Sequence, residues 1–131
     1  MTRAVLADTG PLYAAVDPDD QLHARALSEL TELAADGRRA EVVVTTMMEA
    51  YTLVLFRLGI QVAYRWLDQM SNGAVLIIPT AADASAAFAL VRRYPDQDVA
   101  LFDCLLATLS ERLRQPVWTY DAHYDVLRTE R

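Results

Sequence analysis

The sequence contains no lysine, only one cysteine and two histidines, and no long hydrophobic run. All twelve basic residues are arginine against eighteen acidic residues, so the formal net charge is −6 and the pI is about 4.7. This balance excludes a broadly basic coat for nucleic acid, which would place the pI of a domain above ~9. It still allows a local arginine patch beside an acidic site.

The few cysteines and histidines restrict the kind of site that the chain can build. The lone Cys104 excludes a disulfide framework and sites built from clustered cysteines, and its apolar neighbours predict a place in the core. His23 and His123 are too few for most histidine-based metal sites, and we interpret them as surface or hydrogen-bonded residues. Even the longest apolar runs are short, such as Ala74–Ile78, whereas a membrane span needs ~20 apolar residues. The start of the chain is also too short in apolar residues for a signal peptide, which predicts a cytoplasmic protein without membrane contact.

Short strand-like and longer helical segments alternate along the 131 residues. Since the connections are too long for hairpins, this alternation predicts βαβ crossovers and a parallel sheet between helices. We therefore predict one α/β domain over residues 1–131, with four to five parallel strands flanked by helices on both faces. The predicted strands are Arg3–Ala7, Val42–Thr45, Ala74–Ile78 and Val117–Tyr120, and the predicted helices are Leu22–Ala35, Met47–Leu58, Ile60–Met70, Ala81–Arg93 and Asp98–Leu113.

Carboxylates follow the carboxyl ends of the predicted strands, where parallel α/β sheets bind their ligands. Asp8 and Asp121 directly follow the first and last strands, Glu49 follows the second, and Asp103 lies near the start of the last long helix. Because like charges repel, at least one of these acids would be protonated unless a cation neutralises them, and oxygen ligands are those that Mg²⁺ or Mn²⁺ prefers. These ions activate water and stabilise charge on a phosphate, so the cluster predicts phosphodiester hydrolysis.

Each of these residues also has a purely structural interpretation. Asp8 and Asp121 fit ordinary turn positions, and Asp98 fits a helix N-cap better than a metal ligand. Glu49 and Asp103 interrupt apolar helical runs, where burying an unpaired carboxylate is costly, and this favours a functional role. Hydroxyl and acidic neighbours could orient a carboxylate or the attacking water; these auxiliary candidates are Asp98, Thr9, Thr119 and Asp125.

Four segments match a known pattern through their order and their distances along the chain: Val5–Ala14, Thr45–Tyr51, Tyr94–Cys104 and Trp118–Tyr124. With them the whole chain resembles a PIN-domain ribonuclease, most closely a VapC-type toxin of a bacterial type II toxin–antitoxin system. The resemblance implies a Mg²⁺- or Mn²⁺-dependent endoribonuclease that leaves a 5′-phosphate and a 3′-hydroxyl. The family's four acidic active-site positions fall on Asp8, Glu49, Asp103 and Asp121.

The resemblance also implies partners and finer roles. Toxins of this family form homodimers and are silenced by an antitoxin whose tail inserts near the active site. Asp8 and Asp103 match the positions of direct magnesium ligands, and Thr119 matches a hydroxyl residue that precedes the last acid. Phe102 stands where relatives carry threonine or a small residue, and Ala122 where a basic residue is common. These two departures concern the rate and the choice of RNA more than the chemistry.

Other function classes fit less well. Asp8-Thr9-Gly10 matches the aspartic-protease signature, but that fold is all-β and this chain is rich in helical segments. A haloacid-dehalogenase-type phosphatase requires a second aspartate where Gly10 stands, and a response-regulator receiver domain requires a lysine. The serious alternative is a catalytically weak or inactive PIN-like module that binds RNA or a partner, and cleavage assays with and without EDTA separate the two.

Overall fold

The computed structural model describes residues 3–127, 129 and 131. Within them, β1 (Arg3–Ala7), β2 (Arg38–Val43), β3 (Val75–Ile77) and β4 (Val117–Trp118) form one sheet in the order β3-β2-β1-β4. All three strand pairs are parallel, which confirms the predicted α/β class. The helices are α1 (Thr9–Val16), α2 (His23–Ala35), α3 (Val44–Leu58), α4 (Ile60–Gly73), α5 (Ala81–Val91), α6 (Leu101–Leu113) and α7 (His123–Val126).

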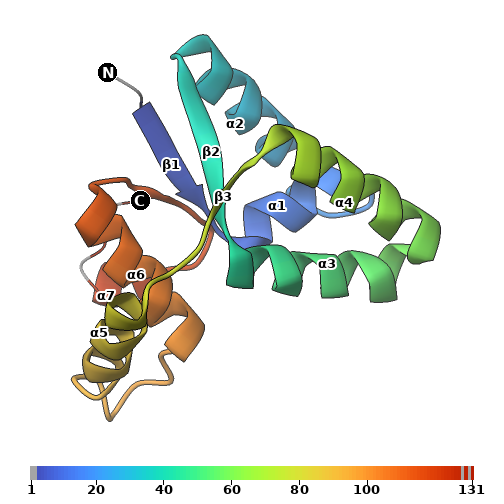
Figure 1. The fold of residues 1–131 in the computed structure, drawn as a ribbon. Coiled ribbons are helices and arrows are strands. Elements are labelled where there is room, and N and C mark those ends of the chain that lie inside the picture. Colours follow the sequence, from blue (N-terminus) through green and yellow to red (C-terminus); the bar gives the residue numbers. More distant parts are fainter. Residues whose placement is uncertain (1–2, 128, 130) are drawn as a thin grey trace.

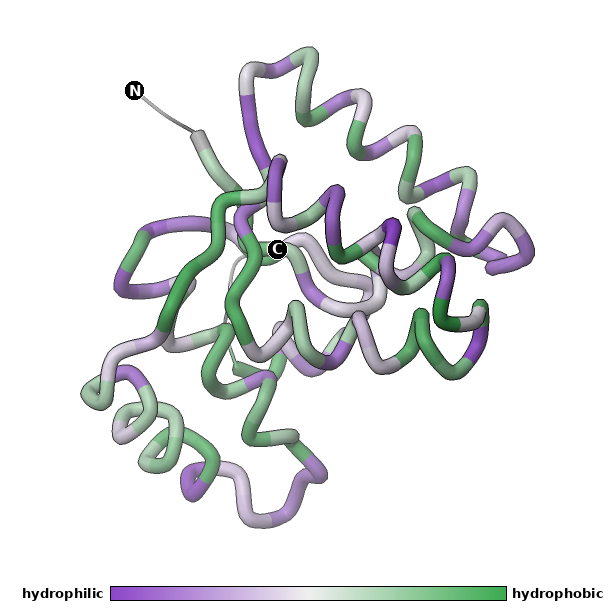
Figure 2. Tube along the Cα trace, turned by 45° about the vertical axis from the view of Figure 1, so that its right-hand side comes forward, coloured by the Kyte–Doolittle hydropathy of each residue, from purple (hydrophilic) through white to green (hydrophobic). Residues whose placement is uncertain are grey.

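Helices cover both faces of the sheet (Figure 1). Val5 and Ala7 of β1 pack into a core cluster with residues of α1 to α4, whereas Leu6 between them packs with residues of α6 and α7. This follows from the alternation of side chains along a strand. Because both faces of the sheet are buried at its centre, Ala4–Ala7 of β1 and Val42–Val43 of β2 are apolar. Hydrophobic and hydrophilic residues alternate along the surrounding helices (Figure 2).

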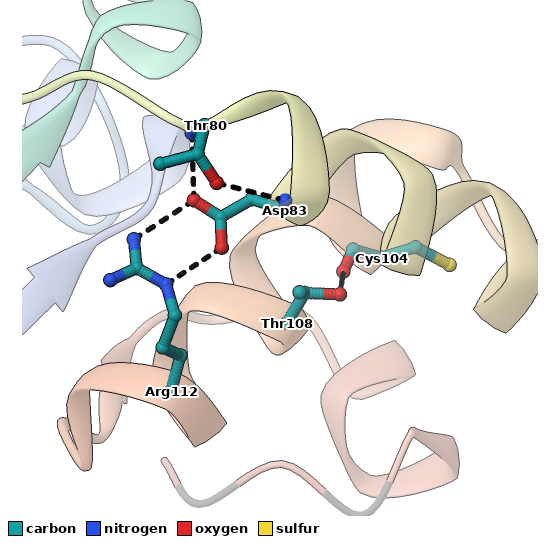
Figure 3. Close-up of polar contacts among 5 residues, drawn as sticks. All are labelled: Thr80, Asp83, Cys104, Thr108 and Arg112. Atoms are coloured by element: carbon teal, nitrogen blue, oxygen red, sulfur yellow. Dashed lines mark hydrogen bonds and ion pairs between the residues drawn. The ribbon is translucent and has the colours of Figure 1, made fainter.

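A charged pair joins α5 to α6 (Figure 3). Thr80 and Asp83 form a capping box at the start of α5, and Arg112 of α6 donates two hydrogen bonds of 2.7 and 2.8 Å to the Asp83 carboxylate. These bonds hold the pKa of the buried Asp83 at about 2. In the same view the Thr108 hydroxyl donates to the Cys104 carbonyl oxygen at 2.8 Å. Cys104 is fully buried, as predicted.

The predicted strand Val42–Thr45 is wrong at both ends. β2 begins earlier, at the exposed Arg38 and Arg39, which pair with β1 through their backbones and carry no hydrophobic signal. The chain enters α3 at Val44, so the β-branched pair Val44 and Thr45 is helical because tertiary packing overrides strand propensity. β3 and β4 are shorter than predicted at their ends, while β1 has its predicted bounds.

The sequence does not predict α1, because Gly10 and Pro11 have the composition of a turn. Both residues lie in the first turn of this helix, where backbone N–H groups have no helical partner and proline is therefore tolerated. Pro11 is itself buried. This helix directly follows β1, and its N-cap residue is Asp8, at the carboxyl edge of the sheet.

The prediction that Asp98 caps the last long helix is wrong. That helix, α6, begins at Leu101 with Ala100 as its N-cap, and Asp98 is exposed in the preceding loop. In that loop the Val99 N–H donates to the Gln97 carbonyl oxygen at 2.9 Å, a turn that delays the helix. The later start places Asp103 in the first turn of α6.

Candidate active site

The four predicted acids line one cavity of about 580 Å³ at the carboxyl edge of the sheet. Asp8 follows β1, Asp121 follows β4 after two further residues, Asp103 comes from the first turn of α6, and Glu49 comes from α3. Parallel strands direct the segments that follow them to a common edge, which is why residues so far apart in sequence meet here. The convergence matches the expectation from sequence, whereas the chemical roles of these acids stay a prediction.

Asp8 is buried and held from three sides. Its backbone N–H donates to the Trp118 carbonyl oxygen at 2.9 Å, which extends the pairing of β1 with β4. One carboxylate oxygen accepts the Thr9 N–H at 2.9 Å, and the other accepts the Thr119 hydroxyl at 2.8 Å. Burial raises the pKa of Asp8. The hydrogen bonds from Thr119 and Thr9 lower this pKa, and the charge of Asp121 raises it. Both donors are uncharged, so they orient the Asp8 carboxylate without neutralising its negative charge.

Thr119 links two acids of the cavity. Its hydroxyl donates to Asp8 and accepts the backbone N–H of Asp121 at 3.0 Å. Thr119 is buried, so both bonds are made away from water, where a hydrogen bond is electrostatically stronger. The predicted auxiliary residue Thr119 therefore lies where it fixes the relative positions of Asp8 and Asp121.

The surroundings of Asp103 disfavour its charged form. Burial, followed by the charges of Asp8 and Asp121, raises its pKa to about 6. The Tyr124 hydroxyl donates to Asp103 at 3.3 Å and acts in the opposite sense. Tyr124 is fully buried, and burial together with the nearby carboxylates raises its own pKa. Sequence reasoning misses Tyr124, because nothing in the segment around it indicates that its hydroxyl reaches Asp103.

His123 lies at the mouth of the cluster. Its backbone N–H donates to the Asp121 carboxylate at 2.8 Å, and its ring Nδ1 lies 3.3 Å from Asp121 Oδ1 and 3.7 Å from Asp103 Oδ2. The His123 side chain is 46% exposed and that of Asp121 41% exposed, so solvent reaches both. The only sequence signal for this contact is the two-residue spacing from Asp121, which is typical of an aspartate that bonds its own backbone two residues on.

Glu49 occupies a different wall of the cavity. The apolar run around it predicts burial, but the structure exposes it on α3, with Leu53 and Arg57 also lining the cavity. The apolar neighbours Ala50 and Val54 turn toward the core instead. Glu49 therefore carries no burial cost, and the argument that burial alone favours function for it is wrong.

Three auxiliary candidates remain. Thr9 lines the cavity, whereas Asp98 and Asp125 are not among the described residues that line it. Thr9 is buried, and its hydroxyl oxygen has no hydrogen-bond partner among the described residues. Asp125 is exposed on α7 and pairs with Arg131 at 3.0 Å. These placements separate one candidate at the cavity from two on the outer surface.

The residues present fit a divalent cation. Asp8 and Asp103 are buried carboxylates whose pKa values are raised, and Asp121 completes a set of oxygen donors from three elements. Hard cations such as Mg²⁺ take carboxylate oxygens, and a positive ion would relieve the repulsion that raises the Asp103 pKa. A close group of three possible ligand atoms comes from Asp103, Asp121 and His123, all within 4.8 Å of one another.

No family model and no curated protein matches the chain. Solved structures do. VapC20 from Mycobacterium tuberculosis, a toxin that cleaves the Sarcin–Ricin loop, is 16% identical with a TM-score of 0.81 over 95% of each chain. VapBC2 from Rickettsia felis, bound to a DNA fragment from its promoter, is 13% identical with a TM-score of 0.72 over 95% of this chain and 92% of the other. FitAcB from Neisseria gonorrhoeae is 15% identical with a TM-score of 0.69 over 96% and 94%.

The solved structures that this chain resembles have the PIN-like fold. At these identities the likeness concerns the course of the backbone. Along that course this chain forms a four-stranded parallel sheet with helices on both faces. The chain therefore has the PIN-like fold that the resemblance of its sequence implied.

Proposed function

We propose that residues 1–131 form one nuclease domain that cleaves RNA phosphodiester bonds with the help of Mg²⁺ or Mn²⁺. The observation that carries this proposal is the convergence of Asp8, Asp103 and Asp121 from three separate elements in one cavity. The likeness in fold to VapC20, a toxin that cleaves the Sarcin–Ricin loop, supports RNA as the substrate.

Asp8, Asp103 and Asp121 would hold the cation, and Glu49 would contact it through water or orient the nucleophile. When bound, the cation supplies activation of water and stabilisation of the charge that develops on the phosphate and the leaving oxygen. The donors around the carboxylates explain why this set is ready to bind. Thr119 and the Thr9 N–H fix Asp8, and Tyr124 restrains Asp103 without neutralising it.

Other residues of the cavity would handle the RNA itself. The Thr9 hydroxyl has no partner among the described residues, so it can donate to a phosphate oxygen or to the attacking water. Arg57 lines the cavity beside Glu49, and a guanidinium suits bidentate contact with phosphate. Glu49 is exposed on the same wall of the cavity. Together these groups would position an RNA phosphate over the acidic cluster.

The biological role that fits this site is the toxin of a toxin–antitoxin pair. VapC20, to which the chain is similar in fold, is a toxin, and this supports an antitoxin as the partner of this chain. A homodimeric, cytoplasmic toxin belongs to the same proposal. An arginine or lysine of an antitoxin tail would complement the acids of the cavity. None of the helices in the described part of the chain is both long and apolar enough to cross a membrane.

RNA cleavage by the purified protein tests this function. We expect cleavage with Mg²⁺ or Mn²⁺, its loss with EDTA, and its recovery when excess Mg²⁺ is added. Asp8→Asn should abolish cleavage, whereas Asp96→Asn, at an exposed loop position outside the cavity, should not change it. Circular dichroism would show that both variants are folded.

Two results would count against the proposal. Cleavage that persists in EDTA, or in Asp8→Asn at the wild-type rate, would separate the activity from this acidic cluster. RNA binding without cleavage under any metal condition would instead favour the alternative of a PIN-like binding module. That alternative draws on the same cavity but needs none of its acids for chemistry.

A further inference from the structure

The proposed function assigns no task to His123, although its ring faces the acidic cluster. His123 begins α7, and the Asp121 carboxylate binds its backbone N–H at 2.8 Å. This bond ties the position of His123 to that of Asp121. The ring Nδ1 then lies 3.3 Å from Asp121 and 3.7 Å from Asp103.

The spacing of these three ligand atoms suits a shared cation. With metal–ligand distances of about 2.1 Å, neighbouring ligands of an octahedral ion lie about 3.0 Å apart and opposite ligands about 4.2 Å apart. The observed nitrogen–oxygen distances of 3.3 and 3.7 Å fall between these two values. All three ligand atoms lie within 4.8 Å of one another, so small side-chain rotations would bring them around one ion.

Two further observations mark this cavity as a place for a ligand. The Asp103 side chain is only 10% exposed, yet it faces two other carboxylates. Thr9 lines the same cavity, is 6% exposed, and has a hydroxyl oxygen without a partner among the described residues. A buried polar atom without a partner is costly, and a bound cation with its water shell would supply one.

We propose that His123 is a nitrogen ligand of the cation held by Asp103 and Asp121, and that it makes the site prefer Mn²⁺ to Mg²⁺. This inference rests on the proposed function in that it refines its metal. Mg²⁺ takes almost exclusively oxygen ligands, whereas an imidazole nitrogen suits transition-metal ions. A neutral imidazole offers the lone pair of Nδ1, the ring atom that faces both carboxylates.

The competing arrangement is a protonated His123 that pairs with the two acids as a built-in counter-ion. In that case its Nδ1 carries a hydrogen and cannot bind metal, and a cation must displace the ring. Removing His123 would then strengthen the binding of both ions to a similar degree. The two arrangements therefore predict opposite changes in metal affinity for the same substitution.

Metal titrations of three proteins decide between them: wild type, His123→Asn and His23→Asn. His23 is the matched control, because its ring Nδ1 lies 2.7 Å from the Ala14 carbonyl oxygen and its ring is not part of the group of possible ligand atoms formed with Asp103 and Asp121. Calorimetry with MnCl₂ and MgCl₂ at neutral pH gives both dissociation constants. We expect the preference for Mn²⁺ over Mg²⁺ to fall about tenfold in His123→Asn and to stay unchanged in His23→Asn.

Electron spin-echo spectroscopy of the Mn²⁺ complex gives a direct readout on the unmodified chain. We expect modulation from an imidazole ¹⁴N in wild type and in His23→Asn, and its loss in His123→Asn. An unchanged preference between the two ions, tighter binding of both in His123→Asn, or no nitrogen modulation in wild type would each overturn the inference.

These outcomes are distinct from failure of the proposed function. If RNA cleavage depends on metal but wild type shows no nitrogen modulation, the nuclease proposal survives and the role of His123 is refuted. If His123 binds Mn²⁺ and no RNA is cleaved, the ligand assignment stands and the nuclease proposal fails. A chain that binds neither cation refutes both.

Discussion

Replacing Asp103 by asparagine should stabilise the metal-free protein, although it removes a native residue. The pKa of Asp103 rises from 3.8 to about 6 in the folded chain, because the carboxyl is buried and faces Asp8 and Asp121. A rise of about two pH units corresponds to about 3 kcal/mol of preference for the neutral form. Asparagine is neutral at every pH, and its carbonyl oxygen can still accept the Tyr124 hydroxyl.

The pH dependence carries the sign of this effect. Between about pH 4 and pH 6 the folded chain binds a proton at Asp103 that the unfolded chain has released, so the free energy of unfolding falls as the pH rises. Above about pH 6 the whole penalty is present. We therefore expect wild type and Asp103→Asn to be similar near pH 4, and the variant to be more stable by about 1–3 kcal/mol near pH 8.

Urea unfolding in EDTA, followed by circular dichroism at a series of pH values, measures this difference. Asp96→Asn is the matched control, because Asp96 is an exposed aspartate that does not belong to the described residues lining the cavity. Adding Mg²⁺ should reverse the order, since the cation stabilises wild type and the variant has lost a ligand. A stability difference for Asp103→Asn that is independent of pH would refute the picture of crowded, uncompensated carboxylates.

Two further predictions concern the hydrogen bonds made by buried carboxylates. Thr119→Val removes the hydroxyl that bonds both Asp8 and Asp121, and we expect it to destabilise the fold by about 1–2 kcal/mol. Mn²⁺ binding measured by calorimetry should weaken about tenfold, and an unchanged affinity would contradict the positioning role of Thr119. Asp83→Asn should cost roughly 1–2 kcal/mol in urea unfolding at neutral pH, since its partner Arg112 is half exposed. The low pKa of Asp83 means that wild type loses this contribution as the pH falls from about 4 to about 2, and an acid-independent difference would argue against the ion pair.

The fold and the meeting point of the acids could be predicted because both depend on patterns along the chain. A strand buried on both faces leaves a short apolar run, and the residue that follows a parallel strand has a fixed destination at the sheet edge. This logic places Asp8 and Asp121 correctly. It fails for the start of β2, because the pairing of Arg38 and Arg39 comes from backbone bonds that leave no hydrophobic trace.

The finer parts of the site depend on local geometry that no periodicity encodes. Tyr124 resembles core from its sequence and is core, yet its hydroxyl reaches Asp103 because α7 packs against α6. His123 faces the acids through one turn of backbone fixed by Asp121. Glu49 lies in an apolar run, but the helix turns it outward, and only the direction of its neighbours toward the core reveals this.

Two buried aspartates of this chain show what distinguishes a structural carboxylate from one available to a cation. Asp83 is 3% exposed and Asp103 is 7% exposed, yet the pKa is about 2 for the first and about 6 for the second. Arg112 neutralises Asp83 through two short bonds and so removes its charge from further use. Asp103 accepts a hydrogen bond from the Tyr124 hydroxyl, and its Oδ2 lies 3.7 Å from the Nδ1 of His123. The charges of the neighbouring carboxylates raise its pKa. Hydroxyl donors fix the direction of a carboxylate without cancelling its charge, so the local instability of the metal-free cavity is the same property that would draw a cation into it.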